Sequence, residues 1–544
     1  MSQKRSMPDL ILINGDIYTQ DPFIPRANTV AIGEGRILAV GDHDAVQSMR
    51  RNHTKVIDLG GRLVLPGMTD AHFHCFEWAL NRQHLALASV TSFDHLRRKV
   101  ESWVNRLAPG KWVIGQGWNE ADWQKPHMPL CQDLDAMSPH NPVILWRCDL
   151  HLAAVNSLAL KAAGIQDDTP DPKDGLIERD ENGRPTGILR ELAINLVRDA
   201  IPSPSDLEAA VALKDAIAEL HRLGLTGIHD TRLMNDQDGD LALRAWRHLD
   251  INRDLDLRCW VTLPGEQLDK AIARGLRTGT GNDCLRIGHV KFFADGGMGA
   301  RTAWLYESYI DADHGMPLIA IADLNSAITK AESAGLAVMI HAVGDRANGE
   351  LIRMFEARMK EKNDADADAK SAIINHRIEH VQMIRPEDIS RLAHTGVAIS
   401  VQPHNMILDM KMIDASVGSR GQWTYAFRDL IDAGIPVMLS SDCPVCDPSP
   451  LIGIHAAVTR QRPDGTPSGG WYPESKIRVD EAIRGYTQTP ASVHGLSDQL
   501  GSITVGKQAD LIVLDRNLYT IDPMEIVDTT VDMTIFNGRI VYSR

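Results

Sequence analysis

The chain has 544 residues, 43% of them hydrophobic and 24% charged, with a formal net charge of −15 and seven cysteines. This length exceeds a single ordinary core, the acidic charge argues against nucleic acid as a partner, and the irregularly spaced cysteines argue against a disulfide framework. No apolar run approaches the roughly 18 residues of a membrane span and no apolar leader begins the chain, so we expect a cytoplasmic protein with no membrane partner.

Both ends of the chain consist of short β-rich runs separated by turns. Near the N-terminus, runs such as 10–13 and 29–32 alternate with turn pairs such as Asn14-Gly15, and near the C-terminus the runs 511–514 and 533–536 follow the same pattern. Because chain ends often lie close together, we expect residues 1–64 and 497–544 to form one small β-sandwich domain.

The stretch 65–74, Leu-Pro-Gly-Met-Thr-Asp-Ala-His-Phe-His, predicts a strand end that carries chemistry. Side chains two residues apart on a strand point to the same face, so His72 and His74 share a face with Asp70. Two imidazoles side by side can bind one metal ion. The apolar run 63–65, broken by Pro66-Gly67, indicates a buried strand that leads into an exposed, functional tip.

The middle of the chain repeats one unit, in which a helical segment ends at a glycine and an apolar β-run follows at once. A glycine after the last helical turn is a common cap, and a continuous apolar run indicates a strand covered on both faces. This unit predicts strands at 225–230, 336–341, 397–402 and 435–442. The apolar runs 257–263, 285–293 and 372–380 fit three more strands, and the strand that ends at His74 makes eight. Eight such strands predict an α/β fold, a (β/α)₈ TIM-like barrel over residues 65–496.

Between the first and second barrel strands the pattern breaks. The region is too long and irregular for one connecting loop, so we expect an inserted subdomain at about residues 80–200. Five tryptophans concentrate there, Trp103, Trp112, Trp118, Trp123 and Trp146. They indicate either an apolar lid over the barrel mouth or the core of the subdomain itself.

Barrel enzymes place their chemistry at the carboxyl ends of the strands, and polar side chains recur at these ends here. The residues are His72, His74, Lys291, His341, His380 and Asp442. Each has an ordinary explanation on its own, such as a core histidine, a helix cap or a buried ion pair. Together they predict a metal site with nitrogen and oxygen donors, suited to Zn²⁺ or its first-row neighbours.

The sequence resembles the amidohydrolase superfamily, in the branch that includes the N-substituted formamide deformylases. The resemblance covers almost the whole chain and rests on several motifs. They are residues 65–74, Gly115-Gln-Gly-Trp118, His151 with Asn156-Ser157, Lys291-Phe-Phe-Ala-Asp-Gly296 with Arg301-Thr-Ala303, His341-Ala-Val-Gly-Asp-Arg-Ala347, Arg377-Ile-Glu-His380, Ser441-Asp442, Thr489-Pro-Ala491 and residues 501–510.

The resemblance implies roles for the strand-end residues. It implies that His72 and His74 hold one metal ion, that His341 and His380 hold a second, and that Asp442 binds the first ion and acts as a base. Lys291 matches the position at which relatives carry a carbamylated lysine that bridges both ions. Carbamylation is a reaction with CO₂ and requires a neutral amine. One or two divalent ions are implied, with zinc expected.

The implied activity is hydrolysis of a carbon–nitrogen bond, in an amide or N-substituted formamide, by attack of a metal-activated water. The substrate is expected to be a small molecule. Residues at positions where relatives line the pocket are His151, Trp118, Gln116, Arg301 and Gln402. Each is equally compatible with a structural role.

Other functions remain open at this point. The same ligands would serve a cyclic-amide hydrolase or a deaminase, and a relative could also be a non-catalytic regulator. The pair Cys443-Pro-Val-Cys446 has the spacing of a thiol redox motif. The natural substrate, the number of ions and the presence of a homo-oligomer do not follow from the sequence.

Overall fold

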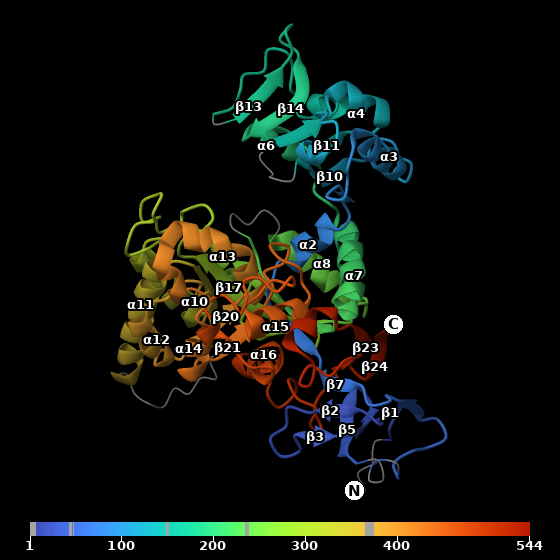
Figure 1. Cartoon of the computed structure of the whole chain (residues 1–544), viewed down its shortest axis with the longest axis vertical. Coiled ribbons are helices and arrows are strands. Elements are labelled where there is room, and N and C mark those ends of the chain that lie inside the picture. The colour runs from blue at the N-terminus through green and yellow to red at the C-terminus, as the bar shows by residue number, and fades with distance from the viewer. Residues whose placement is uncertain are drawn as a thin grey trace. The chain divides into compact units, whose positions relative to one another are not determined.

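The computed structural model describes residues 7–42, 46, 48–147, 152–173, 175–233, 239–364 and 375–544. The chain forms two compact units, Met1–Trp78 with Leu213–Arg544, and Ala79–Ala212. Figure 1 shows the helices and strands in chain colours. None of the helices within the described ranges is long and apolar enough to cross a membrane.

The strands at the two ends of the chain form two sheets, with the orders β5-β4-β1-β6 and β24-β23-β22-β7-β2-β3. In the second sheet β7, from the N-terminal region, pairs antiparallel with β22, from the C-terminal region. Buried apolar side chains from both ends, among them Leu12, Val64 and Leu511, form one core. The strands are β1 Leu10–Ile13, β2 Asp16–Tyr18, β3 Arg26–Ala27, β4 Thr29–Gly33, β5 Arg36–Gly41, β6 Lys55–Asp58, β7 Leu63–Pro66, β22 Leu511–Leu514, β23 Val531–Phe536 and β24 Arg539–Ser543.

Eight strands form the predicted barrel, in the order β8-β15-β16-β17-β18-β19-β20-β21, and all neighbouring pairs are parallel. Apolar residues fill most positions of these strands, as expected for strands covered on both faces. The expected α/β barrel fold is therefore confirmed. The strands are β8 Met68–Phe73, β15 Leu225–Asp230, β16 Arg258–Pro264, β17 Leu285–Phe293, β18 Val338–Ala342, β19 Arg377–His380, β20 Ala398–Val401 and β21 Val437–Leu439.

Backbone hydrogen bonds join the first and last strands of the barrel just beyond their ends. The N–H of Asp442 donates to the carbonyl of His72 at 2.8 Å, and the N–H of His74 donates to the carbonyl of Cys443 at 2.9 Å. Residues about 370 positions apart are thereby held side by side at the carboxyl ends of the strands.

Helices follow the barrel strands and lie around the barrel (Figure 1). Ser205 precedes α7 and caps it reciprocally with Glu208: the N–H of Ser205 donates to Glu208 Oε2, and the N–H of Glu208 donates to the Ser205 hydroxyl. The helices are α2 Cys75–Asn81, α7 Asp206–Arg222, α8 Gly239–Ile251, α9 Leu268–Ala273, α10 Ile321–Ser333, α11 Asp345–Asp364, α12 Pro386–Ala393, α13 Pro403–Val417, α14 Phe427–Asp432, α15 Pro450–Thr459, α16 Val479–Tyr486 and α17 Gln488–Val493.

The second unit has its own six-stranded sheet, in the order β13-β14-β12-β11-β10-β9. Trp118 and Trp123 are buried in one hydrophobic cluster with Trp103 packed against it, and Trp112 and Trp146 pack against a second cluster. The tryptophans therefore build the core of this unit. Its elements are β9 Leu85–Ala86, α3 Phe93–Val104, β10 Val113–Trp118, α4 Cys131–Met137, β11 Val143–Arg147, β12 Leu152–Val155, α5 Ser157–Ala162, β13 Gly175–Arg179, β14 Pro185–Glu191 and α6 Ala193–Arg198.

The first barrel strand differs from the expectation in two respects. The run 63–65 belongs to β7 of the terminal sheet, and the barrel strand β8 begins only at Met68. The end of β8 is also not an exposed tip, because His72 and His74 are 1% and 7% exposed. Asp442, in the segment after β21, lies against both of these side chains.

Candidate metal centre

The six strand-end residues come from five of the barrel strands and gather at their carboxyl ends. His72 lies within β8 and His74 just beyond it, Lys291 lies in β17, His341 in β18, His380 ends β19, and Asp442 follows β21 by three residues. Five of them are at most 8% exposed, and the side chain of His341 is 17% exposed.

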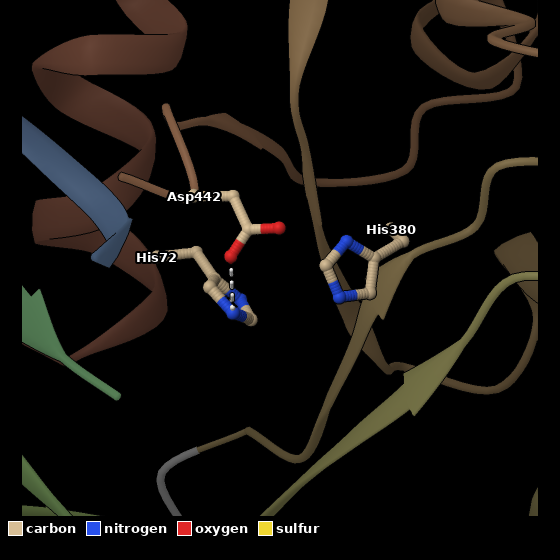
Figure 2. Close-up of side chains that lie close together, drawn as sticks. All are labelled: His72, His380 and Asp442. Atoms are coloured by element: carbon tan, nitrogen blue, oxygen red, sulfur yellow. Dashed lines mark ion pairs between the residues drawn. The ribbon is translucent and has the colours of Figure 1, made fainter. Parts of the chain in front are cut away.

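Asp442 lies at the centre of the first group of candidate ligands. Its Oδ1 is 3.4 Å from His72 Nε2 and 3.1 Å from His74 Nε2. One ligand atom from each of His72, His380 and Asp442 lies within 4.8 Å of the others. Figure 2 shows these three side chains pointing toward one another, with the dashed line joining Asp442 to His72.

The remaining ring nitrogens of His72 and His74 face groups that can only accept a hydrogen bond. His72 Nδ1 is 2.5 Å from Glu379 Oε2, and His74 Nδ1 is 2.9 Å from the carbonyl of Thr231. Each Nδ1 must therefore donate its hydrogen. In the neutral imidazole this leaves a lone pair on Nε2, the atom that faces Asp442.

A second pair of imidazoles lies beside the first. The ring centres of His341 and His380 are 4.4 Å apart, and those of His72 and His380 are 4.9 Å apart. His341 Nε2 donates to the carbonyl of Gly296 at 3.2 Å, and His380 Nδ1 donates to Gln402 Oε1 at 2.8 Å. In these two rings as well, one nitrogen is held by an acceptor and the other keeps its lone pair.

Burial keeps the imidazoles neutral. It lowers the pKa of His72 and His341 well below the usual value and lowers that of His380 to about 3. Burial also tends to raise the pKa of Asp442, but its interactions with His72, His74 and His380 lower it more, and the net pKa lies below its usual range. The site therefore presents an anionic carboxylate to neutral nitrogen donors.

Lys291 is buried within the same layer of the barrel. Within the described ranges its Nζ has no hydrogen bond or ion pair, and it lies 4.9 Å from the centre of the Phe293 ring. Burial lowers the pKa of Lys291 to about 8. A substantial fraction of its amine is therefore neutral near physiological pH.

The backbone is strained at this site. His380, Val381 and Asp442 have φ angles of 74°, 42° and 59°. Such values are unusual for residues with a side chain and most unusual for β-branched valine, and each costs on the order of 1–3 kcal/mol. Because this strain falls on two candidate ligands, the surrounding structure holds their positions at a cost in stability.

The residues present fit a bound divalent cation. Lone pairs on His72 Nε2 and His74 Nε2 and the Asp442 carboxylate would repel one another without a positive charge between them. Their separations of 3.4 Å and 3.1 Å bracket the edge of about 3.3 Å expected of a tetrahedron with zinc–ligand bonds of about 2.0 Å. Nitrogen and oxygen donors without thiolate also suit zinc or its neighbours.

Residues 55–542 match the amidohydrolase family. The chain belongs to this family. It is 32% identical over 535 residues to the putative amidohydrolase YtcJ of Bacillus subtilis, covering 97% of this chain and 98% of that protein. It is 27% identical to the N-substituted formamide deformylase of Arthrobacter pascens, covering 99% of both.

A solved structure from Pyrococcus furiosus, described as an uncharacterized metal-dependent hydrolase, is similar along 94% of this chain and 100% of its own, with a TM-score of 0.78 and 28% identity. The resemblance found in the sequence is thus confirmed. This amidohydrolase is a hydrolase of the metal-dependent class, with a small molecule as its substrate.

The five residues expected to line the substrate pocket of the amidohydrolase have varied surroundings. Trp118 is 0% exposed in the core of the second unit, where its indole N–H donates to the carbonyl of Leu145 at 3.1 Å. Gln116 lies on β10 of the same unit and is exposed. Arg301 pairs with Asp311, Gln402 orients His380, and His151 lies outside the described residues.

Two further carboxylates, those of Glu379 and Asp70, support the site, and the sequence patterns gave them no role. Glu379 holds His72. Asp70 accepts the N–H groups of His72 at 3.0 Å and Ser441 at 3.1 Å, which fastens β8 to the segment after β21, and burial raises its pKa to about 7. Arg377 and Glu379 are two residues apart on a buried strand, so their opposite charges lie on one face. This pattern could have indicated from the sequence that Glu379 has a role in the site.

The surroundings of the two cysteines do not favour thiol chemistry. Cys443 and Cys446 are 1% and 6% exposed, and burial raises the pKa of both thiols. Reactive cysteines have a lowered pKa, because the thiolate is the nucleophile. Neither cysteine therefore has the surroundings of a reactive thiol.

Proposed function

We propose that this protein hydrolyses the carbon–nitrogen bond of N-substituted formamides or related amides. The observation that carries the proposal is the arrangement of four neighbouring imidazoles and one carboxylate. Each imidazole has one ring nitrogen held by an acceptor, and Nε2 of His72 and Nε2 of His74 face the Asp442 carboxylate. The deformylase similarity over nearly the whole chain supports a formamide as the substrate.

His72, His74 and Asp442 would hold one divalent ion, and His341 and His380 a second, with Lys291 between them. Zinc is the expected metal. When bound, such an ion lowers the pKa of water toward about 7 and polarises a carbonyl group.

Asp442 serves as the base and then as the acid. As an anion, its carboxylate takes a proton from the attacking water while the water oxygen forms a bond to the carbonyl carbon. The carbon–nitrogen bond then breaks, and the protonated Asp442 returns that proton to the leaving amine. The products are a carboxylic acid, or formate, and an amine.

Lys291 is the proposed site of carbamylation. The neutral amine attacks CO₂, gives up a proton to water and becomes an anionic carbamate. The carbamate supplies a second oxygen ligand at a position where an unmodified, protonated lysine would be a buried cation. Burial and the lowered pKa of about 8 support this role, because they supply the neutral amine that the reaction needs.

We propose fewer substrate-contacting residues than the five that the sequence indicated. Gln402 acts through His380, which it orients. Trp118 belongs to a core and Arg301 to an ion pair, so we assign neither a substrate contact.

The test combines metal analysis with a substrate panel. Protein purified without chelators should contain one or two equivalents of zinc and should release formate and amine from N-alkyl formamides faster than it opens lactams or deaminates amino-heterocycles. Removal of the metal should abolish turnover, and added zinc should restore it. Metal-free protein with full activity would overturn the proposal, and turnover confined to lactams or amino-heterocycles would replace the substrate class.

A further inference from the structure

A buried ion pair lies beneath His72. Arg377 and Glu379 are both 0% exposed and stand two residues apart on β19, so both side chains point into the barrel. Arg377 Nε donates to Glu379 Oε1, and its second terminal nitrogen donates to Oε2, both at 3.0 Å. The carboxylate is gripped at both oxygens and has a fixed orientation.

This pair reaches across the barrel to β8. Glu379 Oε2 accepts from His72 Nδ1 at 2.5 Å, and Arg377 donates to the carbonyl of Ala71 at 2.7 Å. The other terminal nitrogen of Arg377 donates to His229 Nδ1 at 2.7 Å, which anchors the guanidinium. The position of the His72 ring is therefore set by a network with a fixed donor and acceptor at each contact.

The acceptor of His72 differs in charge from those of the other three imidazoles. His74 and His341 donate to backbone carbonyls, and His380 donates to the neutral amide of Gln402. Within this set, only His72 donates its hydrogen to a carboxylate; His341 Nε2 lies 3.9 Å from Asp295 Oδ1, beyond hydrogen-bond distance. A hydrogen bond to a charged acceptor is about twice as strong as one between neutral groups, and it increases the electron density on the imidazole.

We propose that Glu379, gripped by Arg377, is a positioning residue that makes His72 the strongest nitrogen donor of the metal centre. It also determines the order of filling, so that the ion held by His72 and His74 binds before the ion held by His341 and His380. The inference rests on the proposed metal-dependent function, because it assumes that these histidines are ligands.

The test measures zinc affinity directly. Metal-free protein is titrated with zinc in competition with a chromophoric chelator, and thermal unfolding of each variant establishes that it is folded. Glu379→Gln keeps the size and an acceptor oxygen but removes the charge, and it should raise the Kd of the first zinc about 10- to 100-fold. The Kd of any second zinc should change by less than about threefold, since no ligand of that ion contacts the carboxylate directly.

Conservative variants separate charge from shape. Glu379→Asp keeps the charge with a shorter reach and should recover part of the lost affinity. Arg377→Lys keeps the positive charge but loses the two-pronged grip, so its effect should lie between those of the wild type and Glu379→Gln. If Glu379→Gln does not fold, the predicted order of the two conservative variants relative to wild type still tests the inference.

Asp510→Asn is the matched control. Asp510 forms a similar buried two-pronged pair with Arg258, with contacts of 2.5 Å and 3.0 Å, at the opposite ends of the strands. This variant should lower thermal stability and leave the zinc Kd unchanged. Equal weakening by both variants, or a Glu379→Gln protein that binds its first zinc as tightly as wild type, would overturn the inference. A wild-type protein that binds no zinc would instead overturn the proposed function.

Discussion

Two layers inside the barrel contain buried histidines, yet only one of them has the properties of a metal site. The site layer comprises His72, Lys291, His341 and Glu379. The base layer comprises His229, His289 and Arg377, with His494, the residue that follows α17. On β17 and β19 the two layers are two residues apart, as His289 and Lys291 and as Arg377 and Glu379.

Burial acts in the same way on both layers. It lowers the pKa of His229 and His289 well below the usual value and lowers that of His494 to about 3. The rings of His229 and His494 are 4.2 Å apart, as close as rings in the site layer. Neither neutral imidazoles nor their proximity distinguishes a metal site.

What differs is the direction of the lone pairs and the presence of a carboxylate. In the base layer His229 Nδ1 accepts from Arg377, and His494 Nε2 is buried without a hydrogen-bond partner among the described residues. It lies beside a cavity of about 30 Å³ that has room for one or two waters. In the site layer the Nε2 lone pair of His72, together with that of His74, faces Asp442, and the backbone of Asp442 is strained.

The largest expected effect comes from removing the carboxylate on which the site layer converges. Asp442→Asn should lower kcat by about 10³-fold or more, because the general base and the anionic ligand are both lost. The metal-free protein should stay folded, since asparagine keeps the size of the side chain and tolerates a φ of 59° well. Steady-state kinetics and thermal unfolding check both statements, and near-normal turnover would exclude the role of Asp442.

The control for that experiment is a base-layer change. His494→Gln removes a buried imidazole of similar pKa but touches none of the candidate ligands in the described structure. Its kcat should therefore remain close to that of wild type, whereas a comparable loss would remove the distinction between the two layers.

The same base-layer variant makes a prediction about pH. His494 has a folded pKa of about 3, against about 6.5 in the unfolded chain. Between these values the unfolded chain binds a proton that the folded protein does not, so stability is lost as the pH falls from about 6.5 toward 3. His494→Gln should reduce this slope by up to about 1.4 kcal/mol per pH unit and leave it unchanged above pH 7.

Urea unfolding of metal-free wild type and variant across this pH range measures the difference. Working without metal prevents zinc release from contributing to either slope. Parallel curves for the two proteins would show that His494 does not stay neutral in the folded state.

The barrel could be predicted from the sequence because its signals are local. Glycine caps followed by apolar runs indicated four of the strands, β15, β18, β20 and β21, and apolar runs alone indicated three more. The strand-end rule then located His72, His341, His380 and Asp442. These features depend only on neighbours in the chain and on the period of a strand.

The support of the ligands could not be predicted in the same way. Glu379 contacts a histidine 307 positions away, and the carbonyls of Thr231 and Gly296 are backbone groups that no residue letter marks. The resemblance placed Gln402 among the residues that line the pocket. Its contact with His380 could not be predicted, because that contact depends on the spacing of two adjacent strands. From the sequence, Trp118 could belong either to a lid over the barrel mouth or to the core of the inserted subdomain, since both need an apolar ring.

The smallest expected effect comes from the cysteines that follow Asp442. A Cys443→Ser/Cys446→Ser protein should keep its turnover within about threefold, because thiols whose pKa is raised by burial supply no thiolate at neutral pH. Some stability should be lost, since Cys446 Sγ contacts Asn405 Oδ1 at 2.5 Å and Cys443 is 1% exposed. Kinetics with zinc-loaded protein check the first statement. A loss of turnover as large as that of Asp442→Asn, at unchanged zinc content, would show that the chemistry extends beyond the strand-end ligands to these thiols.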